Sequence, residues 1–416
     1  MEFNLFTLVF LAATLGYVVT LLWLNLRQDK AVIASCEQVP EAFADHISLS
    51  QHQKAAEYTQ AKLLVNHFEI IFSALVLLLW TLGGGLDWLD QFWRTQLTDT
   101  LYIGTGFVIS LMIIAGLIDL PFNLYRTFVL EQKFGFNKTT PAVFMGDLFK
   151  EFLLILLMGL PLVLAILWLM QAMGSLWWLY VWLLLTGFSL LMFWLYPSYI
   201  APLFNEFKPL ENLALKAKIE NLLSRTGFKS DGVFVMDGSK RSSHGNAYFT
   251  GMGKNKRIVF FDTLLEGMED QEVEAILAHE LGHFHHQHIR KHMISSFAIT
   301  LVGLALLGYL INQNWFYHGL GISEASNHTA LVLFMLITPV FSFFISPISN
   351  ALSRKHEFEA DRFAADNTDA KDLISSLVKL YRDNAATLTP DRLYSAFHDS
   401  HPPAAIRIDQ LKKHGA

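Results

Sequence analysis

The residues best suited to chemistry in this sequence are two histidines and a glutamate, in the run His279-Glu280-Leu281-Gly282-His283. They fall in a stretch, residues 271–291, whose pattern predicts a helix. Histidines four positions apart lie on one face of a helix, about one turn from each other. Two neutral imidazoles at this spacing can bind one Zn²⁺, and the neighbouring glutamate can act as a general base. The motif therefore predicts a zinc metallopeptidase.

A catalytic zinc site needs three protein ligands and an open position, so the two histidines require a partner. The segment 353–361 offers one, because Glu357 and Asp361 are four residues apart and share a helix face. Glu359 points to a different face by the same geometry. We expect Glu357 to be the third ligand and Asp361 to orient a ligand histidine through its free N–H. Without the histidine motif, a solvated charged helix would be the simpler interpretation.

The other histidines near the motif are weaker candidates for ligands. Four of them follow it closely: His285, His286, His288 and His292. Their positions favour interfacial or supporting groups over primary ligands. His356 precedes Glu357 but is turned from it by a helical step of about 100°. The motif alone could also be the polar face of a helix, and the candidate third ligand argues against that interpretation.

The composition indicates a membrane protein. Of 416 residues, 53% are apolar and 16% are charged, whereas soluble domains carry about 25% charged residues. The first apolar stretch begins Met1-Glu2, without the basic residues of a signal peptide, so we expect an uncleaved helix. The predicted fold is mainly α, a multi-pass membrane protein with seven transmembrane helices. The seven stretches that reach the roughly 20 residues needed to cross a bilayer are 3–25, 67–86, 101–120, 152–173, 176–195, 295–311 and 329–348.

The charges exclude some functions and suggest an orientation. The net charge is −6 without any basic block, which argues against a nucleic-acid partner. The single cysteine, Cys36, excludes an internal disulfide and a cysteine-based metal site. Lysine and arginine gather in the links 26–66 and 121–151, whereas the links on the opposite side carry only Arg94. The positive-inside rule then places the N-terminus outside, with the C-terminus and residues 203–292 in the cytoplasm.

We expect a membrane domain of five spans, residues 1–202, and a zinc metallopeptidase domain, residues 203–416. The second domain includes the sixth span, about 295–311, and the seventh, about 329–348. Periodicity and turn residues predict its other elements: a helix at 210–226 closed by Gly227, a strand at 233–236, a hairpin of strands 246–250 and 257–261 that turns at 251–256, and helices at 354–365, at 372–384 and after Pro402-Pro403.

The two halves of the metal motif lie close to membrane spans. His283 comes about a dozen residues before the sixth span, and Glu357 about nine after the seventh. Continuous helices, which rise about 1.5 Å per residue, would place both residues within about 18 Å of the bilayer edge. A short link joins the two spans, so they should form an antiparallel pair that brings the halves together. The spacing therefore predicts a substrate with a membrane-associated part.

These motifs resemble the type I CAAX prenyl protease family, integral-membrane zinc metallopeptidases related to the HtpX heat-shock proteases. The resemblance extends over nearly the whole chain. The phenylalanine-glycine-phenylalanine-asparagine element and the N-terminal region favour the CAAX branch over the shorter HtpX branch. Beside the residues above, the resemblance includes the segments 127–131, 134–140, 246–251 and 400–403, with Arg407.

The resemblance implies a fold and a set of site residues. Seven transmembrane helices would enclose a chamber, with a small β-hairpin or sheet beside a zinc site of the gluzincin type. The zinc ligands would be His279, His283 and Glu357, and Glu280 would be the catalytic base. Four further residues have implied roles: Asn246 and Ala247 in pairing with the substrate backbone, His401 in stabilising the oxyanion, and Arg407 in supporting the site.

Simpler interpretations exist for two of these residues. Asn246 could serve a turn, since asparagine is common in turns. His401-Pro402-Pro403 could be an ordinary helix entry with proline in the first turn.

The expected function is zinc-dependent hydrolysis of peptide bonds near the C-terminus of lipidated, CAAX-type prenylated or membrane-associated substrates, with one Zn²⁺ per chain. The expected membrane is the endoplasmic reticulum in a eukaryote and the inner membrane in a bacterium. One alternative is an HtpX-like protease for membrane-protein quality control, without prenyl specificity. Another is a non-catalytic, zinc-stabilised membrane protein that binds lipid or peptide. Glu280 argues against the last, because a structural zinc site needs no general base.

Overall fold

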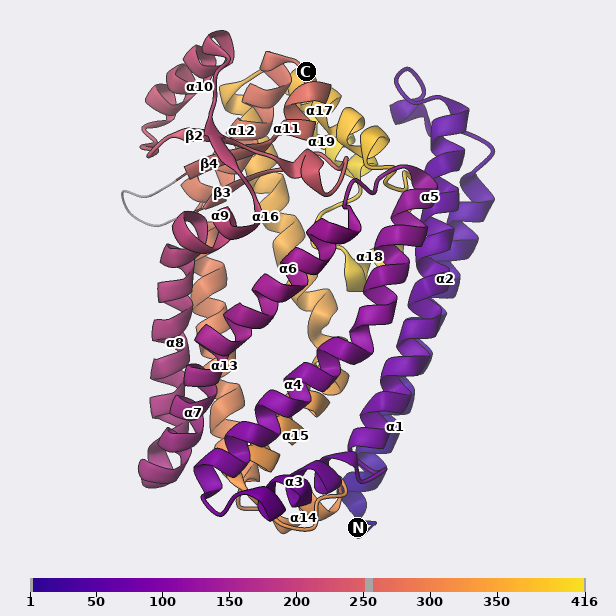
Figure 1. Cartoon of the computed structure of the whole chain (residues 1–416). Helices are drawn as coiled ribbons and strands as arrows, with labels where there is room; N and C mark the ends of the chain where they lie inside the picture. Colours follow the sequence, from indigo (N-terminus) through magenta and orange to yellow (C-terminus); the bar gives the residue numbers. More distant parts are fainter. Residues whose placement is uncertain (1–2, 251–256, 415–416) are drawn as a thin grey trace.

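Seven long helices form the body of the molecule within residues 3–250 and 257–414, the part that the computed structural model describes (Figure 1). Each has the length and composition to cross a bilayer, which confirms the expected transmembrane helices and the mainly α fold. They are Leu5–Ser35 (α1), Leu49–Trp80 (α2), Thr100–Phe134 (α4 and α5), Pro141–Ala172 (α6 and α7), Gly174–Phe204 (α8 and α9), His288–Leu310 (α13) and Asn327–Asn367 (α15 and α16).

Four of these helices, as described, contain an irregular turn that redirects the chain without ending the helix. Three are π turns: Arg126–Glu131 between α4 (Thr100–Tyr125) and α5 (Gln132–Phe134), Ile155–Gly159 between α6 (Pro141–Leu154) and α7 (Leu160–Ala172), and Tyr196–Ile200 between α8 (Trp177–Leu195) and α9 (Ala201–Phe204). The fourth is the 3₁₀ turn Phe343–Ile345 between α15 (Asn327–Ser342) and α16 (Ser346–Asn367).

The helices do not end where the apolar stretches end. The third span continues to Phe134 and the seventh to Asn367, well past the predicted ends at 120 and 348, because their polar ends pack on other elements. α2 ends at Trp80, earlier than predicted. Gly84 there takes the left-handed conformation, with φ of 78°, and the amphipathic helix α3 (Gly85–Gln96) begins.

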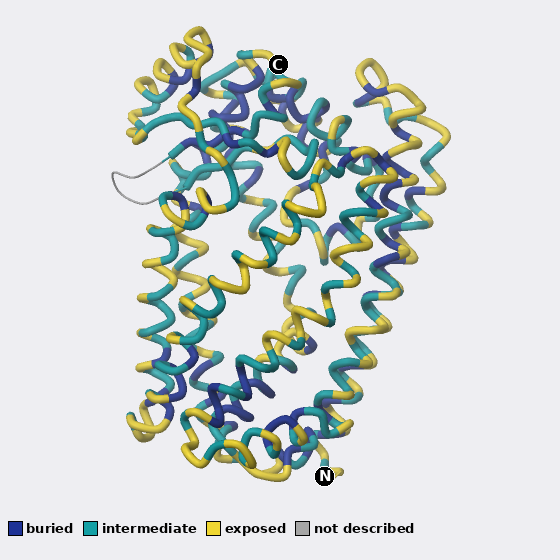
Figure 2. Tube along the Cα trace, viewed as in Figure 1, coloured by how far each residue is buried: buried dark blue, intermediate teal, exposed yellow. Residues whose placement is uncertain are grey.

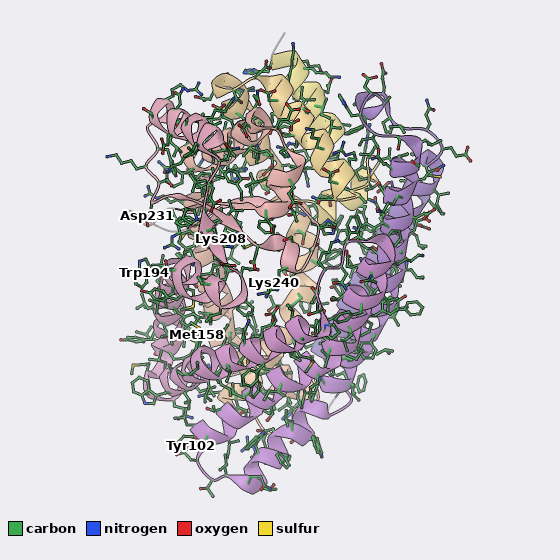
Figure 3. All side chains as sticks on the ribbon, turned by 45° about the horizontal axis from the view of Figure 1, so that its top comes forward. Tyr102, Met158, Trp194, Lys208, Asp231 and Lys240 are labelled. Carbon is green, nitrogen blue, oxygen red and sulfur yellow. The ribbon has the colours of Figure 1, made fainter. Side chains whose placement is uncertain are left out.

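Many residues of the long helices are exposed (Figure 2), and large apolar side chains are common among them. Leu117, Leu157 and Val302 are 62%, 72% and 68% exposed, which suits contact with lipid. In Figure 3 the labelled charged residues Lys208 and Lys240 belong instead to the part outside the bundle. Buried residues gather at both ends of the molecule (Figure 2), in one cluster within the bundle and another around the sheet. The surface pattern therefore supports a multi-pass membrane protein with a polar part at one end.

A small mixed sheet lies at that end, with the strand order β1-β2-β4-β3 among the described strands. The predicted strand β2 (Val233–Met236) is confirmed, and so is the antiparallel pairing of β3 (Ala247–Thr250) with β4 (Arg257–Phe261). The expected turn at 251–256 lies outside the described residues. The sequence did not predict β1 (Phe207–Pro209) or the parallel pairing of β2 with β4. β3 is an edge of this sheet.

Helices surround the sheet and the ends of the bundle, and three of them lie close to the helices predicted at 210–226, at 372–384 and after Pro402-Pro403. The helix expected at 271–291 is shorter than predicted and ends at His285, because Gln287 takes a left-handed conformation before α13 begins. The remaining helices are α10 (Leu213–Thr226), α11 (Asp262–Gly267), α12 (Asp270–His285), α14 (Asn314–His318), α17 (Ala370–Asp383), α18 (Arg392–His398) and α19 (Ala404–His414).

Candidate active site

The close packing of α12 on α16 brings the two halves of the metal motif together. Gly282 makes the approach possible: a Cβ at this position would lie 2.8 Å from the Cα of Ala360 and 3.0 Å from its carbonyl oxygen. Ala360 is itself fully buried. On α12, Glu269 and Glu272 form a capping box, and Glu272 also binds Lys379 of α17. The histidines therefore stand on a helix that is held at its first turn and packed closely on α16 near its end.

The three predicted ligand residues converge, as their spacing predicted. The Nε2 atoms of His279 and His283 are 3.2 Å apart. Glu357 Oε1 lies 3.2 Å from His283 Nε2, and Glu357 Oε2 lies 3.5 Å from His279 Nε2. A tetrahedral zinc ion with bonds near 2.05 Å would separate its ligands by about 3.3 Å. The arrangement therefore suits one tetrahedral cation.

Glu357 gives independent evidence for this fit. Its Oε2 atom is buried and makes no hydrogen bond within the described residues, and its nearest cationic group, Arg407 Nη1, lies 3.6 Å away. A buried acceptor without a partner is costly in a folded protein. A cation held between Glu357, His279 and His283 would satisfy it, since carboxylate oxygen and imidazole nitrogen are ordinary zinc ligands.

The buried carboxylate of Asp361 and guanidinium of Arg407 support His279 at its Nδ1 atom. His279 Nδ1 lies 2.9 Å from Asp361 Oδ1, so the ring can donate to Asp361 and present Nε2 to the cation. Arg407 of α19 donates from Nε and Nη2 to the two oxygens of Asp361, at 2.8 and 2.5 Å. Burial lowers the pKa of His279, but the neighbouring carboxylates of Asp361 and Glu357 outweigh it and raise the pKa to about 9. The surrounding carboxylates thus favour a positive charge next to this ring, which a metal ion at Nε2 would supply.

Glu280 faces a cavity of about 560 Å³, which His279, His401, Arg407, Asn246 and Ala247 also line. Burial raises the pKa of the Glu280 carboxyl, and the neighbouring rings of His279 and His283 lower it in part. A carboxylate with a raised pKa is a better proton acceptor than an ordinary one.

His401 reaches the same cavity from the other side of the site. Its Nε2 atom lies 3.5 Å from Glu357 Oε1, and its side chain is 63% exposed. Pro402 and Pro403 follow directly, and α19 then begins at Ala404. The backbone here is therefore a helix entry, as the simpler interpretation expected. The same segment also places the His401 ring in the wall of the cavity.

The expected substrate-binding residues lie at the edge of the sheet. Ala247 is the first residue of β3, and the Asn246 carbonyl accepts a hydrogen bond from the Phe261 amide at 3.0 Å. The chain before them is held by Asn384, whose Oδ1 accepts from the Gly245 amide at 3.2 Å. The sequence did not single out Asn384. It lies at the end of α17, where nothing in its neighbours indicates a contact with the sheet.

The motif at 134–140 supports this edge as well. Phe136 stacks on His244, with ring centroids 4.4 Å apart. The amide of Lys138 donates to the carbonyl of Arg241 at 3.0 Å. These contacts connect the end of the third span to the residues before β3. The motif thus positions the sheet edge and is not itself part of the reactive site.

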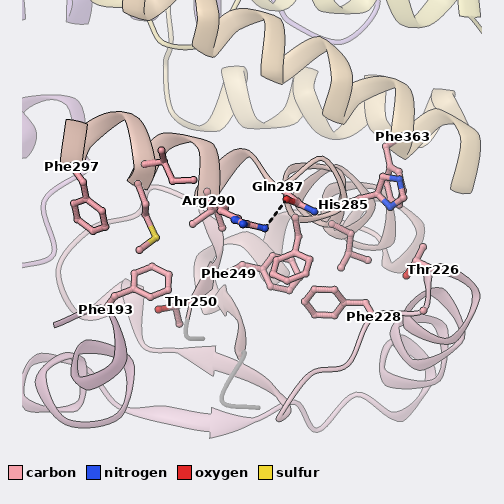
Figure 4. Close-up of a pocket in the computed structure, with 16 residues that line it drawn as sticks. Phe193, Thr226, Phe228, Phe249, Thr250, His285, Gln287, Arg290, Phe297 and Phe363 are labelled. Carbon is pink, nitrogen blue, oxygen red and sulfur yellow. Dashed lines mark hydrogen bonds between the residues drawn. The ribbon is translucent and has the colours of Figure 1, made fainter. Parts of the chain in front are cut away.

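A larger cavity, of about 830 Å³, lies on the opposite face of α12 (Figure 4). Phenylalanine rings line it, among them Phe228, Phe249 and Phe297, which Figure 4 labels around the opening. His285 and Arg290 are its titratable lining residues. Since neither the ligand residues nor Glu280 reaches it, we place the chemistry in the smaller cavity.

Gly282→Ala should disrupt the site through packing alone. The added methyl group meets backbone atoms of Ala360, so we expect a loss of about 1–3 kcal/mol in unfolding free energy. A shift of α12 against α16 would also weaken zinc binding by about tenfold, because each 1.4 kcal/mol of strain at the site costs that factor. Thermal unfolding and chelator competition measure the two effects. Gly146→Ala is the matched control, as a Cβ there meets nothing within 4 Å, and equal behaviour of both variants would contradict the packing argument.

Membrane-length helices, and a His-Glu-x-x-His helix packed on a second helix that carries Glu357, define an integral-membrane metallopeptidase. Comparison with known proteins gives the same class. Residues 29–206 match the family model described as CAAX prenyl protease N-terminal, five membrane helices, and residues 209–414 match peptidase family M48. The chain belongs to the CAAX prenyl protease family of M48 metallopeptidases, which confirms the family resemblance.

The relatives match over almost their full length. The CAAX prenyl protease 1 homolog of Arabidopsis thaliana is 34% identical, and the match covers 96% of each chain. The Homo sapiens homolog is 32% identical, over 93% of this chain and 91% of the relative. The crystal structure of S. mikatae Ste24p superposes with a TM-score of 0.90 at 31% identity, covering 99% of this chain and 100% of that one. The chain is therefore a membrane metalloprotease with the Ste24p fold.

Proposed function

We propose that the chain uses one Zn²⁺ to hydrolyse peptide bonds near the C-terminus of lipidated substrates of the CAAX prenyl type. The names of its relatives support the substrate class. The observation that carries the proposal is a series of adjoining cavities between the membrane helices and Glu280, described next. Such a path suits a substrate that is part peptide and part membrane-embedded chain.

The series begins with a cavity of about 570 Å³ among α1, α2, α4 and α15. A second cavity, of about 460 Å³, shares Asn66, Tyr394 and His398 with it. The second in turn shares His401 and Tyr381 with the cavity at Glu280. These volumes fall within the usual range for small-molecule sites, about 300–1,000 Å³. An isoprenoid could therefore lie between the membrane helices while its peptide reaches Glu280.

The proposed ligands are His279, His283 and Glu357. When bound, zinc would polarise the scissile carbonyl and acidify a water molecule. Glu280 accepts a proton from the attacking water and returns it to the leaving amine. His401 donates a hydrogen bond to the oxygen that gains negative charge.

The remaining site residues hold the catalytic groups and the substrate in place. Asp361 and Arg407 orient His279, a role that the contact of Asp361 with His279 and the hydrogen bond from Arg407 to Asp361 support. The substrate backbone extends along β3 as an added strand, with Asn246 and Ala247 as its partners. The position of β3 at the edge of the sheet among the described strands, and the place of Asn246 and Ala247 in the cavity wall, support this role.

We also propose the orientation and the division of the chain. The N-terminus lies outside, and the C-terminus and the active site lie in the cytoplasm. The uneven distribution of lysine and arginine between the links supports this orientation. A membrane domain, 1–202, and a metallopeptidase domain, 203–416, divide the chain close to the point where the two family matches meet. The net charge of −6 supports the absence of a nucleic-acid partner.

The test compares one peptide with and without a farnesyl group on the cysteine, using the purified full chain. We expect cleavage after the prenylated cysteine, with kcat/KM at least about tenfold higher than for the unmodified peptide, because burial of the chain contributes about 0.8 kcal/mol per CH₂. Glu280→Gln is the control for a contaminating protease. Equal rates on both peptides would contradict prenyl specificity and favour the quality-control alternative.

A further inference from the structure

His288 contacts a proposed metal ligand, although it belongs to the next helix. Its Nδ1 atom lies 3.1 Å from Nδ1 of His283. Its Nε2 atom lies 2.9 Å from Oε2 of Glu359. The ring is buried, with 4% of the residue exposed, and His356 stacks on it at 4.0 Å with planes 13° apart. His288 is thus fixed in position and in ring plane between His283 and Glu359.

The break between α12 and α13 makes this contact possible. Five residues of continuous helix would turn His288 about 140° away from His283. Instead Gln287 adopts φ of 57° and ψ of 32°, a left-handed conformation that residues other than glycine seldom take. The Gln287 amide side chain accepts a hydrogen bond from Arg290 at 3.4 Å, which is drawn in Figure 4. This left-handed residue changes the direction of the chain, so that the His288 side chain lies beside His283.

The positions of the hydrogens follow from the metal. If His283 gives the lone pair of Nε2 to a cation, the neutral ring carries its hydrogen on Nδ1. That hydrogen points at His288 Nδ1, which must then accept and be unprotonated. The neutral His288 ring therefore carries its hydrogen on Nε2, facing the Glu359 carboxylate. Each N–H in the series from His283 through His288 to Glu359 then has an acceptor. The series therefore fixes one tautomer for each of the two rings.

The same atoms could also suggest a second metal site, since ligand atoms of His288, His356 and Glu359 lie within 4.8 Å of one another. A cation there would need the lone pair of His288 Nε2, and the hydrogen would move to Nδ1. Two N–H groups, on His283 and His288, would then oppose each other across 3.1 Å. A second cation would therefore disturb the first, and the contacts favour a supporting role.

We infer that His288, held by Glu359, is a positioning residue for the metal ligand His283. It accepts the Nδ1 hydrogen of His283, as Asp361 accepts that of His279, and so sets the direction of the Nε2 lone pair. Each histidine ligand then has its own buried acceptor, Asp361 of α16 for His279 and His288 of α13 for His283. The inference rests on the proposed function in one point, that His283 is a ligand.

The test measures zinc loss from the purified full chain to a chelator. His288→Leu removes the acceptor and should release zinc about 10–100 times faster, the usual cost of losing an outer partner. His288→Asn places Oδ1 where Nδ1 stood, and should restore the rate to within about threefold of the wild type. The visible spectrum of the Co²⁺-substituted chain should shift in the leucine variant only. The matched control is His292→Leu, because His292 is exposed on the same helix, α13.

The outcomes separate this inference from the ligand assignment. If His288→Leu loses zinc at the wild-type rate while Glu357→Gln loses it rapidly, the inference is overturned and the ligand assignment is unaffected. Equal acceleration in the leucine and asparagine variants would show a packing role only, and would also overturn it. Two zinc ions per wild-type chain, with one lost in His356→Ala, would establish the second metal site instead. Wild-type zinc loss in Glu357→Gln would overturn the ligand set itself.

Discussion

Glu280→Gln should abolish peptide hydrolysis and leave zinc bound. Glutamine has the shape of glutamate but cannot accept the proton of the attacking water, and general-base catalysis contributes about 10²–10⁴-fold. Glu280 is not among the three residues that converge on the metal position, so its charge is not needed to hold the ion. We expect kcat/KM to fall by about 10²–10⁴-fold. Peptide cleavage and zinc content, measured on one preparation, give both values.

Two controls make this result specific. Glu274→Gln changes a glutamate of the same helix that binds Arg225 away from the site, and should leave hydrolysis unchanged. Glu280→Asp keeps the carboxylate but shortens the side chain by one methylene. Its kcat/KM should lie between those of the wild type and the glutamine variant. Full activity in Glu280→Gln would refute the assigned base. Loss of zinc from that variant would show that Glu280 serves the metal site and not only the proton transfer.

The sequence predicted the membrane helices because their signal is local. A run of about 20 apolar residues can hardly be stable except across a bilayer or in a core. Helix ends were less predictable, since tertiary packing decides them. α16 continues to Asn367 because Ala360 and Ala364 are buried against neighbouring helices. β1 consists of three residues that pair with β2 alone, too short for a periodic pattern.

The site was predictable to the extent that helix periodicity governs it. His279 with His283 and Glu357 with Asp361 are i, i+4 pairs, so each pair shares a face before any tertiary structure is known. The distance between the pairs is a tertiary fact, and only the short link between two spans suggested it. His401 and Arg407 came from the family resemblance, since no local pattern connects α19 to α12. The position of His288 was unpredictable, because the turn at Gln287 contains neither glycine nor proline.

Glu357→Gln should leave the chain folded and nearly free of zinc. A neutral amide keeps the side-chain volume but loses the negative charge that balances the cation. A site with four ligands binds zinc with about 10–16 kcal/mol, so one ligand accounts for roughly 3–4 kcal/mol and its loss weakens binding by about 10²–10³-fold. Elemental analysis after dialysis against a weak chelator measures the occupancy, and peptide cleavage should fall with it.

Asp366→Asn is the control for this variant, because Asp366 lies on the same helix and binds His414 at the surface. It should keep both zinc and activity. Thermal unfolding of the two variants after zinc removal shows whether Glu357→Gln has damaged the fold. Similar midpoints with unequal zinc occupancy would assign the loss to the ligand. Unchanged zinc in Glu357→Gln would leave two histidines as the only ligands, too few for a stable catalytic zinc site, and the third would have to be sought among His401 and Glu280 around the same cavity.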